Sequence, residues 1–188
     1  MNILVRPFGS KLCYSRPDTT WERENKDFYS PECVNEIYWT PIVFARISKA
    51  GKCIGEKFAD RYYDSINFGM LLHCKPDGEE GLAFSSCVDR TSILPAPLYN
   101  PIVLENTDNV FEVTVNGNTV FTAEGGLKVK QVIEDTICKA SVLTSLRIGD
   151  FVAAELANEK KAASRGGEDV TVRGTFCENE TLQFKIIF

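Results

Sequence analysis

The sequence predicts a single α+β domain that is mostly β, spanning residues 1–188. Three observations support this prediction. Several segments alternate polar and apolar residues with the period of two that is typical of half-buried strands. Only one long segment has helical periodicity, and a chain of 188 residues has the usual length of one domain. Neither repeats nor low-complexity tracts interrupt the pattern.

Strand signals dominate the chain, and the clearest is a hairpin in "FEVTVNGNTVFTA". Asn116-Gly117 joins two alternating runs there, which is the strongest short-range signal for a type I′ turn. The segment "EIYWTPIVFARISKAGK" predicts a strand that ends at a turn at Ala50-Gly51. Pro41 cannot donate to a ladder, so we expect it at an edge, a bulge or the strand's start. Three more strands are expected near the carboxyl end, in "DFVAAEL", "EDVTVRGTF" and "TLQFKIIF".

One segment has convincing helical periodicity, "LKVKQVIEDTICKASVLTSL". It places the following apolar residues on roughly one face: Val129, Val132, Ile133, Ile137, Ala140 and Leu143. The stretch "CIGEKFADRYYDSINF" permits a second, short helix. The charged stretch "ANEKKAASRGGED" predicts a long and mobile loop.

Composition restricts the partners and the compartment. A net charge of −5 and an isoelectric point near 5.1 argue against nucleic acid and anionic membrane surfaces, since both require a basic stripe. No stretch approaches transmembrane length or resembles a signal peptide, so we expect a cytoplasmic protein. The seven cysteines are widely spaced and contain no C-x-x-C pair, so we expect free and mostly buried thiols.

Motifs that carry chemistry are few. The chain has one histidine, His73, next to Cys74. Adjacent residues of a regular strand point to opposite faces, so these two side chains are not expected to form a nucleophile and its base. We expect His73 to be a partly exposed strand end. The neighbouring carboxylates of Asp77, Glu79 and Glu80 are typical of a solvated turn rather than of a metal site.

An ordered series of segments carries the interpretation further: "RPDTTWERENKDFYSP", "NEIYWTPIVFARISKAGKCI", "EKFADRYYDSINFGM", "FEVTVNGNTV" and "SLRIGD". In this order the series resembles the catalytic domain of the fumarylacetoacetate hydrolase family, above all its compact bacterial members. The resemblance implies a mixed β-sandwich roll and a homodimer. It also implies a Mg²⁺ or Mn²⁺ ion on three carboxylates that supports hydrolysis, isomerisation or decarboxylation of acylpyruvate-like oxo-acids.

The chain departs from the family pattern at the three positions that the resemblance assigns to metal ligands. Thr40 and Ile42 stand where the strand of the family has its two glutamates, and Leu71 stands at the aspartate. Aliphatic side chains cannot coordinate a hard divalent cation. The resemblance therefore predicts that this chain binds no metal cofactor.

Other parts of the family site are also altered. Ser86 stands at a family lysine, while Asp89 keeps the aspartate that follows it. Glu155 stands at a glycine of the turn that contacts substrate in the family. The resemblance also leads us to expect a shortened amino-terminal segment, and "MNILVRPFGSK" has no histidine to match the one that the family uses in catalysis.

Three hypotheses follow. The first is a non-catalytic, homodimeric scaffold or binding protein, in which His73, Lys75, Asp89 and Glu155 form a vestigial ligand-binding site. The second is an enzyme acting on oxo-acids with a rebuilt site that uses these four residues or Asp77, which requires them to converge in one pocket. The third is a subunit that regulates an active paralogue.

Overall fold

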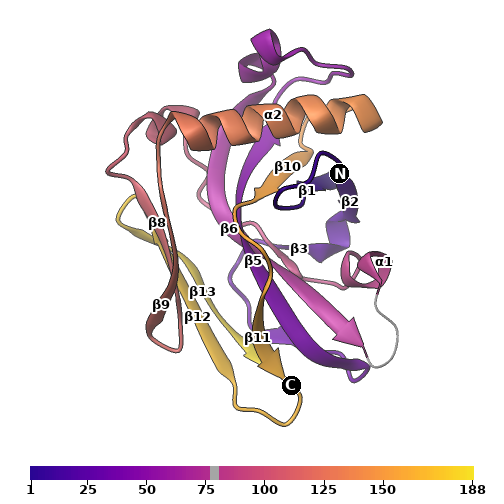
Figure 1. Ribbon diagram of the computed structural model, residues 1–188, viewed down its shortest axis with the longest axis vertical. Coiled ribbons are helices and arrows are strands. Elements are labelled where there is room, and N and C mark those ends of the chain that lie inside the picture. Colours follow the sequence, from indigo (N-terminus) through magenta and orange to yellow (C-terminus); the bar gives the residue numbers. More distant parts are fainter. Residues whose placement is uncertain (77–80) are drawn as a thin grey trace.

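The computed structural model describes residues 1–76 and 81–188, which form two β-sheets and a long helix (Figure 1). The larger sheet has the strand order β2-β1-β10-β5-β6-β7-β3, and β11 also pairs with β5. Its strands are β1 (Asn2–Arg6), β2 (Tyr14–Pro17), β3 (Trp21–Glu22), β5 (Val34–Ile47), β6 (Tyr63–Pro76), β7 (Ser92–Ile93), β10 (Phe151–Glu155) and β11 (Lys160–Ser164). The predicted α+β fold, mostly β, is confirmed.

The smaller sheet has the order β4-β13-β12-β8-β9. Its strands are β4 (Phe28–Tyr29), β8 (Val110–Val115), β9 (Asn118–Glu124), β12 (Val170–Phe176) and β13 (Asn179–Ile187). Helix α2 (Leu127–Leu143) crosses one end of the larger sheet next to β10 and β1 (Figure 1). The other helical segments are short: α1 (Leu82–Ser85) and the 3-10 turns η1 (Asp18–Thr20), η2 (Glu56–Arg61) and η3 (Pro101–Glu105).

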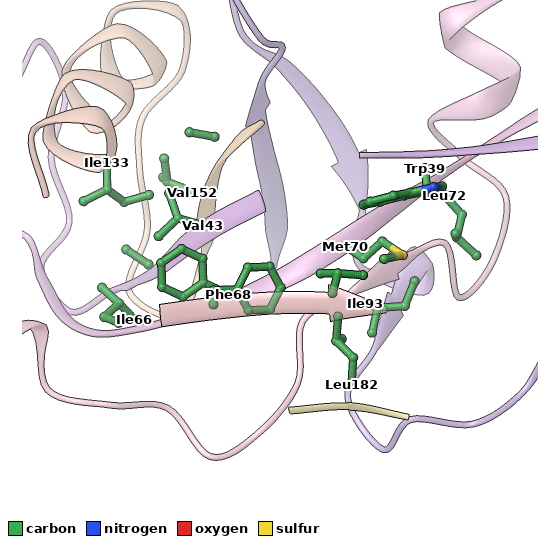
Figure 2. Close-up of a cluster of buried hydrophobic side chains, with 14 of the residues drawn as sticks. Trp39, Val43, Ile66, Phe68, Met70, Leu72, Ile93, Ile133, Val152 and Leu182 are labelled. Carbon is green, nitrogen blue, oxygen red and sulfur yellow. The ribbon is translucent and has the colours of Figure 1, made fainter. Parts of the chain in front are cut away.

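The main core lies between the two sheets and beneath α2. Phe68 of β6 stacks on Phe111 of β8 with ring centroids 4.8 Å apart, and it meets Phe176 of β12 edge-on at 4.6 Å. Ile133 of α2 and Val43 of β5 belong to the same cluster (Figure 2). The two sheets and the helix therefore share one apolar interior.

The opposite face of the larger sheet carries a second apolar cluster, and we call this side the site face. The cluster comprises Ile3, Val5, Ile42, Phe44, Leu71, Leu94, Phe151 and Ala153. Strands β5 and β6 therefore bury both faces, which explains the long, nearly continuous apolar runs in their sequences. This second cluster occupies the positions at which the resemblance places the metal site.

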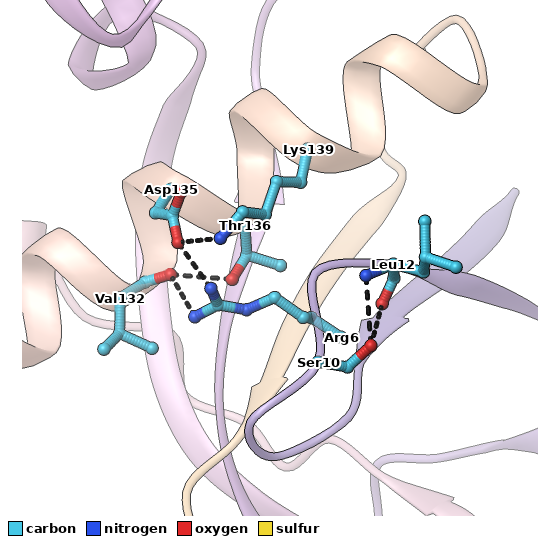
Figure 3. A network of polar contacts seen from close by, with 7 residues as sticks. All are labelled: Arg6, Ser10, Leu12, Val132, Asp135, Thr136 and Lys139. Atoms are coloured by element: carbon cyan, nitrogen blue, oxygen red, sulfur yellow. Dashed lines mark hydrogen bonds and ion pairs between the residues drawn. The ribbon is translucent and has the colours of Figure 1, made fainter.

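A polar network attaches α2 to the amino-terminal strand (Figure 3). Arg6, at the end of β1, donates to the carboxylate of Asp135 and, at 3.2 Å, to the carbonyl of Val132. Lys139 also donates to Asp135, one helical turn further along. This contact fixes the segment after β1, which lies close to Glu155.

Most of the predicted elements are confirmed. Asn116 and Gly117 have φ values of 49° and 79°, as a type I′ hairpin between β8 and β9 requires. The predicted helix is α2, the three carboxyl-terminal strands are β10, β12 and β13, and the short helix is the 3-10 turn η2. The stretch "ANEKKAASRGGED" was wrongly predicted to be only a loop, because it contains β11. Its polar composition suits a strand that pairs on one side only.

Pro41 lies in the interior of the central strand β5, opposite Met70, and not at an edge or at the strand's start. Its carbonyl accepts from Leu156 N, in the gap between the pairing of β10 and that of β11 with β5. The N and C=O of one residue point to the same side of a strand, so the nitrogen of Pro41 faces this gap. The missing donor therefore costs no ladder hydrogen bond with β6.

Two further outcomes concern cysteine and membrane association. The seven thiols are unpaired, but three of them are exposed and only Cys74 is buried, so the expectation of mostly buried thiols is wrong. In the described ranges, no helix has the length and apolarity to cross a membrane.

Candidate functional site

Strand pairing brings the three altered ligand positions together on the site face. Thr40 of β5 lies opposite Leu71 of β6, and Ile42 follows on the same face of β5. Ile42 and Leu71 are both 0% exposed and pack in the second apolar cluster. Thr40 offers one hydroxyl, which is already bonded to His73.

These residues do not fit a divalent metal ion. Mg²⁺ and Mn²⁺ need several oxygen ligands, whereas Ile42 and Leu71 present only methyl and methylene groups. Within residues 1–76 and 81–188, no group of three His, Cys, Asp or Glu side chains is arranged to hold a metal.

A polar cluster begins directly beside the apolar one. His73 lies opposite Tyr38 in the β5–β6 pair, and Glu155 lies opposite Ile42 at the end of β10, so both side chains reach the site face. His73 Nε2 is 3.0 Å from Thr40 Oγ1 and 3.6 Å from Glu155 Oε1. The other carboxylate oxygen of Glu155 accepts from Phe8 N at 3.1 Å.

Burial controls the ionisation of this cluster. His73 is 8% exposed, so the expectation of a partly exposed strand end is wrong. Burial lowers the pKa of His73 to about 3, and the positive charges of Arg16 and Lys75 lower it further, so the imidazole is neutral at neutral pH. Burial also raises the pKa of Glu155, while the hydrogen bond from Phe8 N and the charge of Arg16 oppose this shift.

Two members of the polar cluster were missed in the sequence, Tyr14 and Arg16 of β2. Arg16 is fully buried, and its Nη2 donates to Leu72 O, Ser85 O and Thr91 Oγ1. Its Nε and Nη1 and the hydroxyl of Tyr14 make no hydrogen bond of ordinary geometry within the described residues, although the Tyr14 hydroxyl lies close enough to Arg16 to interact with it. Burial raises the pKa of Tyr14 to about 12. The spacing of two in "YSR" places both on one strand face, but it does not indicate which face.

The remaining predicted site residues are only partly brought together. Lys75 Nζ lies 2.7 Å from Glu159 Oε1 and 3.8 Å from the ring centroid of Tyr38. With His73 and Ser85 it lines a cavity of about 290 Å³. Asp89 lies elsewhere, in an exposed turn that lines a different cavity beside Asp27 and Arg90. Asp77, Glu79 and Glu80 lie outside the described residues.

Glu155 also lines a cavity of about 400 Å³ on the side of the amino-terminal loop. Three basic residues, Arg6, Lys11 and Lys139, line the same cavity. Two of these cations, Arg6 and Lys139, already bond to the carboxylate of Asp135, and Glu155 can exchange a proton with a molecule in this cavity. The chemistry that the arrangement offers is hydrogen bonding and proton transfer.

Comparison with known proteins places this architecture. No family profile matches the sequence, and no curated protein does. Among solved structures, the fumarylpyruvate hydrolase of Pseudomonas aeruginosa, in complex with Mn²⁺ and pyruvate, is similar with a TM-score of 0.78 and 14% identity, over 100% of this chain and 90% of that chain. A Yersinia pestis CO92 structure described as a fumarylacetoacetate hydrolase family protein has a TM-score of 0.75 and 12% identity, over 99% and 92% of the two chains.

A third structure extends the range of activities. The 5-carboxymethyl-2-hydroxymuconate delta-isomerase of Mycobacterium smegmatis has a TM-score of 0.75 and 14% identity, over 99% of this chain and 78% of that chain. Hydrolases and an isomerase thus share the architecture. The predicted resemblance is confirmed at the level of the fold, and this chain has the fold of the fumarylacetoacetate hydrolase family.

Proposed function

We propose that this protein has the fumarylacetoacetate hydrolase fold without the family's metal-dependent catalysis, and that it acts as a homodimeric scaffold or binding protein in the cytoplasm. One observation carries the proposal: Ile42 and Leu71, at the ligand positions, are fully buried in an apolar cluster. A cation there would lose its hydration shell and gain no oxygen ligand from Ile42 or Leu71, which is strongly unfavourable. Pairing with a paralogous subunit, which the protein would then regulate, is a variant of this proposal.

Electron paramagnetic resonance of Mn²⁺ tests the proposal directly, because the signal of free Mn²⁺ weakens when the ion binds to protein. We expect an unchanged signal on titration with this protein, with or without pyruvate or oxalate. The fumarylpyruvate hydrolase of Pseudomonas aeruginosa, solved with Mn²⁺ and pyruvate, is the positive control. Stoichiometric loss of the free signal would refute the proposal. The Glu155→Gln variant would then report whether His73 and Glu155 hold the ion.

Thermal unfolding gives a second measurement of the same point. A ligand that binds the native state at a hundredfold excess over its Kd adds about 2.7 kcal/mol of stability. We expect Mg²⁺ and Mn²⁺ to leave the melting temperature unchanged. Sedimentation equilibrium measures the mass of the protein in solution, and we expect the mass of a dimer. A monomer at micromolar concentration would contradict the proposed homodimer.

A second candidate function, a metal-free enzyme that acts on oxo-acids, is favoured by the contact of Thr40, His73 and Glu155. The pKa of His73 makes the imidazole a weak base, so Glu155, whose pKa is raised, is the better acid or base near neutral pH. The test is turnover of an acylpyruvate or of oxaloacetate in excess chelator. Glu155→Gln should abolish any activity. Asp89→Asn should preserve it, because Asp89 lies outside the cavities that Glu155 and His73 line. Equal rates with and without the protein would exclude this candidate.

A further inference from the structure

A separate cavity of about 480 Å³ opens at the other end of the site face. Glu155 and Phe151 are four residues apart on β10 with side chains on the same face, so about 13 Å separates the polar cluster from this cavity. Phe151 lines the cavity, and the second apolar cluster lies between the two sites. The cavity does not include His73, Glu155 or the three altered ligand positions.

The walls of the cavity are apolar and held in place by hydrogen bonds. Trp21 meets Phe151 edge-on with ring centroids 5.1 Å apart, and its indole Nε1 donates to Leu94 O at 3.0 Å. Buried Asn67 holds the adjoining loop by donating to Pro97 O at 2.9 Å. These contacts fix the positions of the walls, and the volume of the cavity lies in the range typical of small-molecule sites.

The rim of the cavity is positively charged. Three arginines line it, Arg23, Arg46 and Arg147, and all are exposed. Arg23 lies 3.7 Å from Glu24, but within the described residues no carboxylate forms an ion pair with Arg46 or Arg147. Among the described residues, the only acid in the lining is Asp150, which is 1% exposed and accepts from two backbone N–H groups, those of Asn2 and Arg147.

We propose that this cavity binds a small amphipathic anion, a carboxylate or sulfonate whose aromatic or aliphatic body lies against Trp21 and Phe151. The negatively charged head group lies between Arg46 and Arg147, whose guanidinium groups can each donate two parallel hydrogen bonds to it. Charge complementarity selects an anion, and the apolar walls select a ligand with a hydrophobic body over a bare inorganic ion.

Anilinonaphthalene sulfonate is a suitable probe because it joins an aromatic body to one anionic group. We expect saturable binding to one site, measured by the rise in probe fluorescence. The double variant Arg46→Gln/Arg147→Gln should weaken binding about tenfold, equivalent to about 1.4 kcal/mol. The matched control, Lys57→Gln/Lys128→Gln, removes two exposed cations outside the cavity and should leave the affinity unchanged.

A second variant and a second probe keep the test specific. Ile148→Trp fills the mouth of the cavity from a side chain that is 70% exposed, so it should reduce binding without affecting folding. Phenylnaphthylamine, the uncharged relative of the probe, should bind the wild type and the double arginine variant equally. The proposal is overturned if the arginine variant binds the sulfonate like the wild type, or if binding does not saturate. It is also overturned if a second copy of the chain covers the cavity and excludes the probe.

Discussion

Acidification should destabilise this protein through its single histidine. The pKa of His73 is about 3 in the folded state against 6.5 as the ordinary value, so between these limits the unfolded chain binds more protons than the native one. Stability is then lost as the pH falls from about 6.5 towards about 3. Between about pH 7 and about pH 4.5, the protonation of unfolded His73 alone lowers the free energy of unfolding by about 2.5 kcal/mol.

Glu155 contributes with the opposite sign in this range. Its folded pKa is raised, so the native state binds the extra proton and gains stability as the pH falls through that value. Comparison with His73→Gln isolates the histidine, because Glu155 and all other titrating groups are common to both proteins. In urea denaturation at the two pH values, the wild type should lose about 2.5 kcal/mol more than the variant.

Nuclear magnetic resonance measures the pKa of His73 in the folded protein directly and needs no variant. Because the chain contains one histidine, its imidazole gives one Cε1–H resonance that needs no assignment to a residue in an untagged protein. That resonance should keep the shift of a neutral ring from about pH 7 to about pH 4.5, where a solvated imidazole is almost fully protonated. An inflection near the ordinary value, or equal losses of stability in wild type and variant, would show that His73 is solvated and would refute its placement in the buried cluster.

Three further substitutions test the packing. Leu71→Asp should cost more than about 3 kcal/mol in urea denaturation because it buries a charge without a partner, whereas Leu71→Met should cost less than about 1.5 kcal/mol. Gly69→Ala should cost about 1–3 kcal/mol of unfolding free energy, since an added Cβ would overlap the carbonyl oxygen of Ile93. Gly55→Ala is its near-neutral control, because a Cβ there would lie 3.8 Å from its nearest neighbour, Phe58 Cδ2. Gly117→Ala, at φ 79°, should cost about 1 kcal/mol, and an unchanged unfolding midpoint would contradict the type I′ turn.

Local patterns predicted the fold well wherever one physical cause dominated. The Asn116-Gly117 turn and the periodicity of α2 are properties of short segments, and both are confirmed. The position of Pro41 and strand β11 could not be predicted, because they depend on each other. A proline is tolerated inside β5 only where the neighbouring strand is interrupted, and the polar "KKAAS" pairs only because β5 is present.

The site was predicted less completely for a similar reason. Aligned motifs placed Thr40, Ile42 and Leu71 at the ligand positions, and the register of β5 and β6 puts Thr40 opposite Leu71. The burial of His73 and the presence of Arg16 in the polar cluster follow from long-range packing. Strand β2, which carries Arg16, is placed in the sheet by its pairing with β1, and β1 pairs in turn with β10. No pattern within a single segment contains that information.

The apolar cluster makes the two ends of the site face energetically independent. Carboxylates at the three ligand positions would repel one another in the absence of a cation. The burial of Ile42 and Leu71 at these positions instead stabilises the fold by about 1.5–3 kcal/mol for each side chain. Sites separated by about 13 Å with no shared partners are additive within about 0.5 kcal/mol. Glu155→Gln should therefore leave the affinity for the sulfonate probe unchanged, and Arg46→Gln/Arg147→Gln should leave the pH dependence of unfolding unchanged. Coupling larger than this in either direction would mean that the cluster transmits structural change between the two ends.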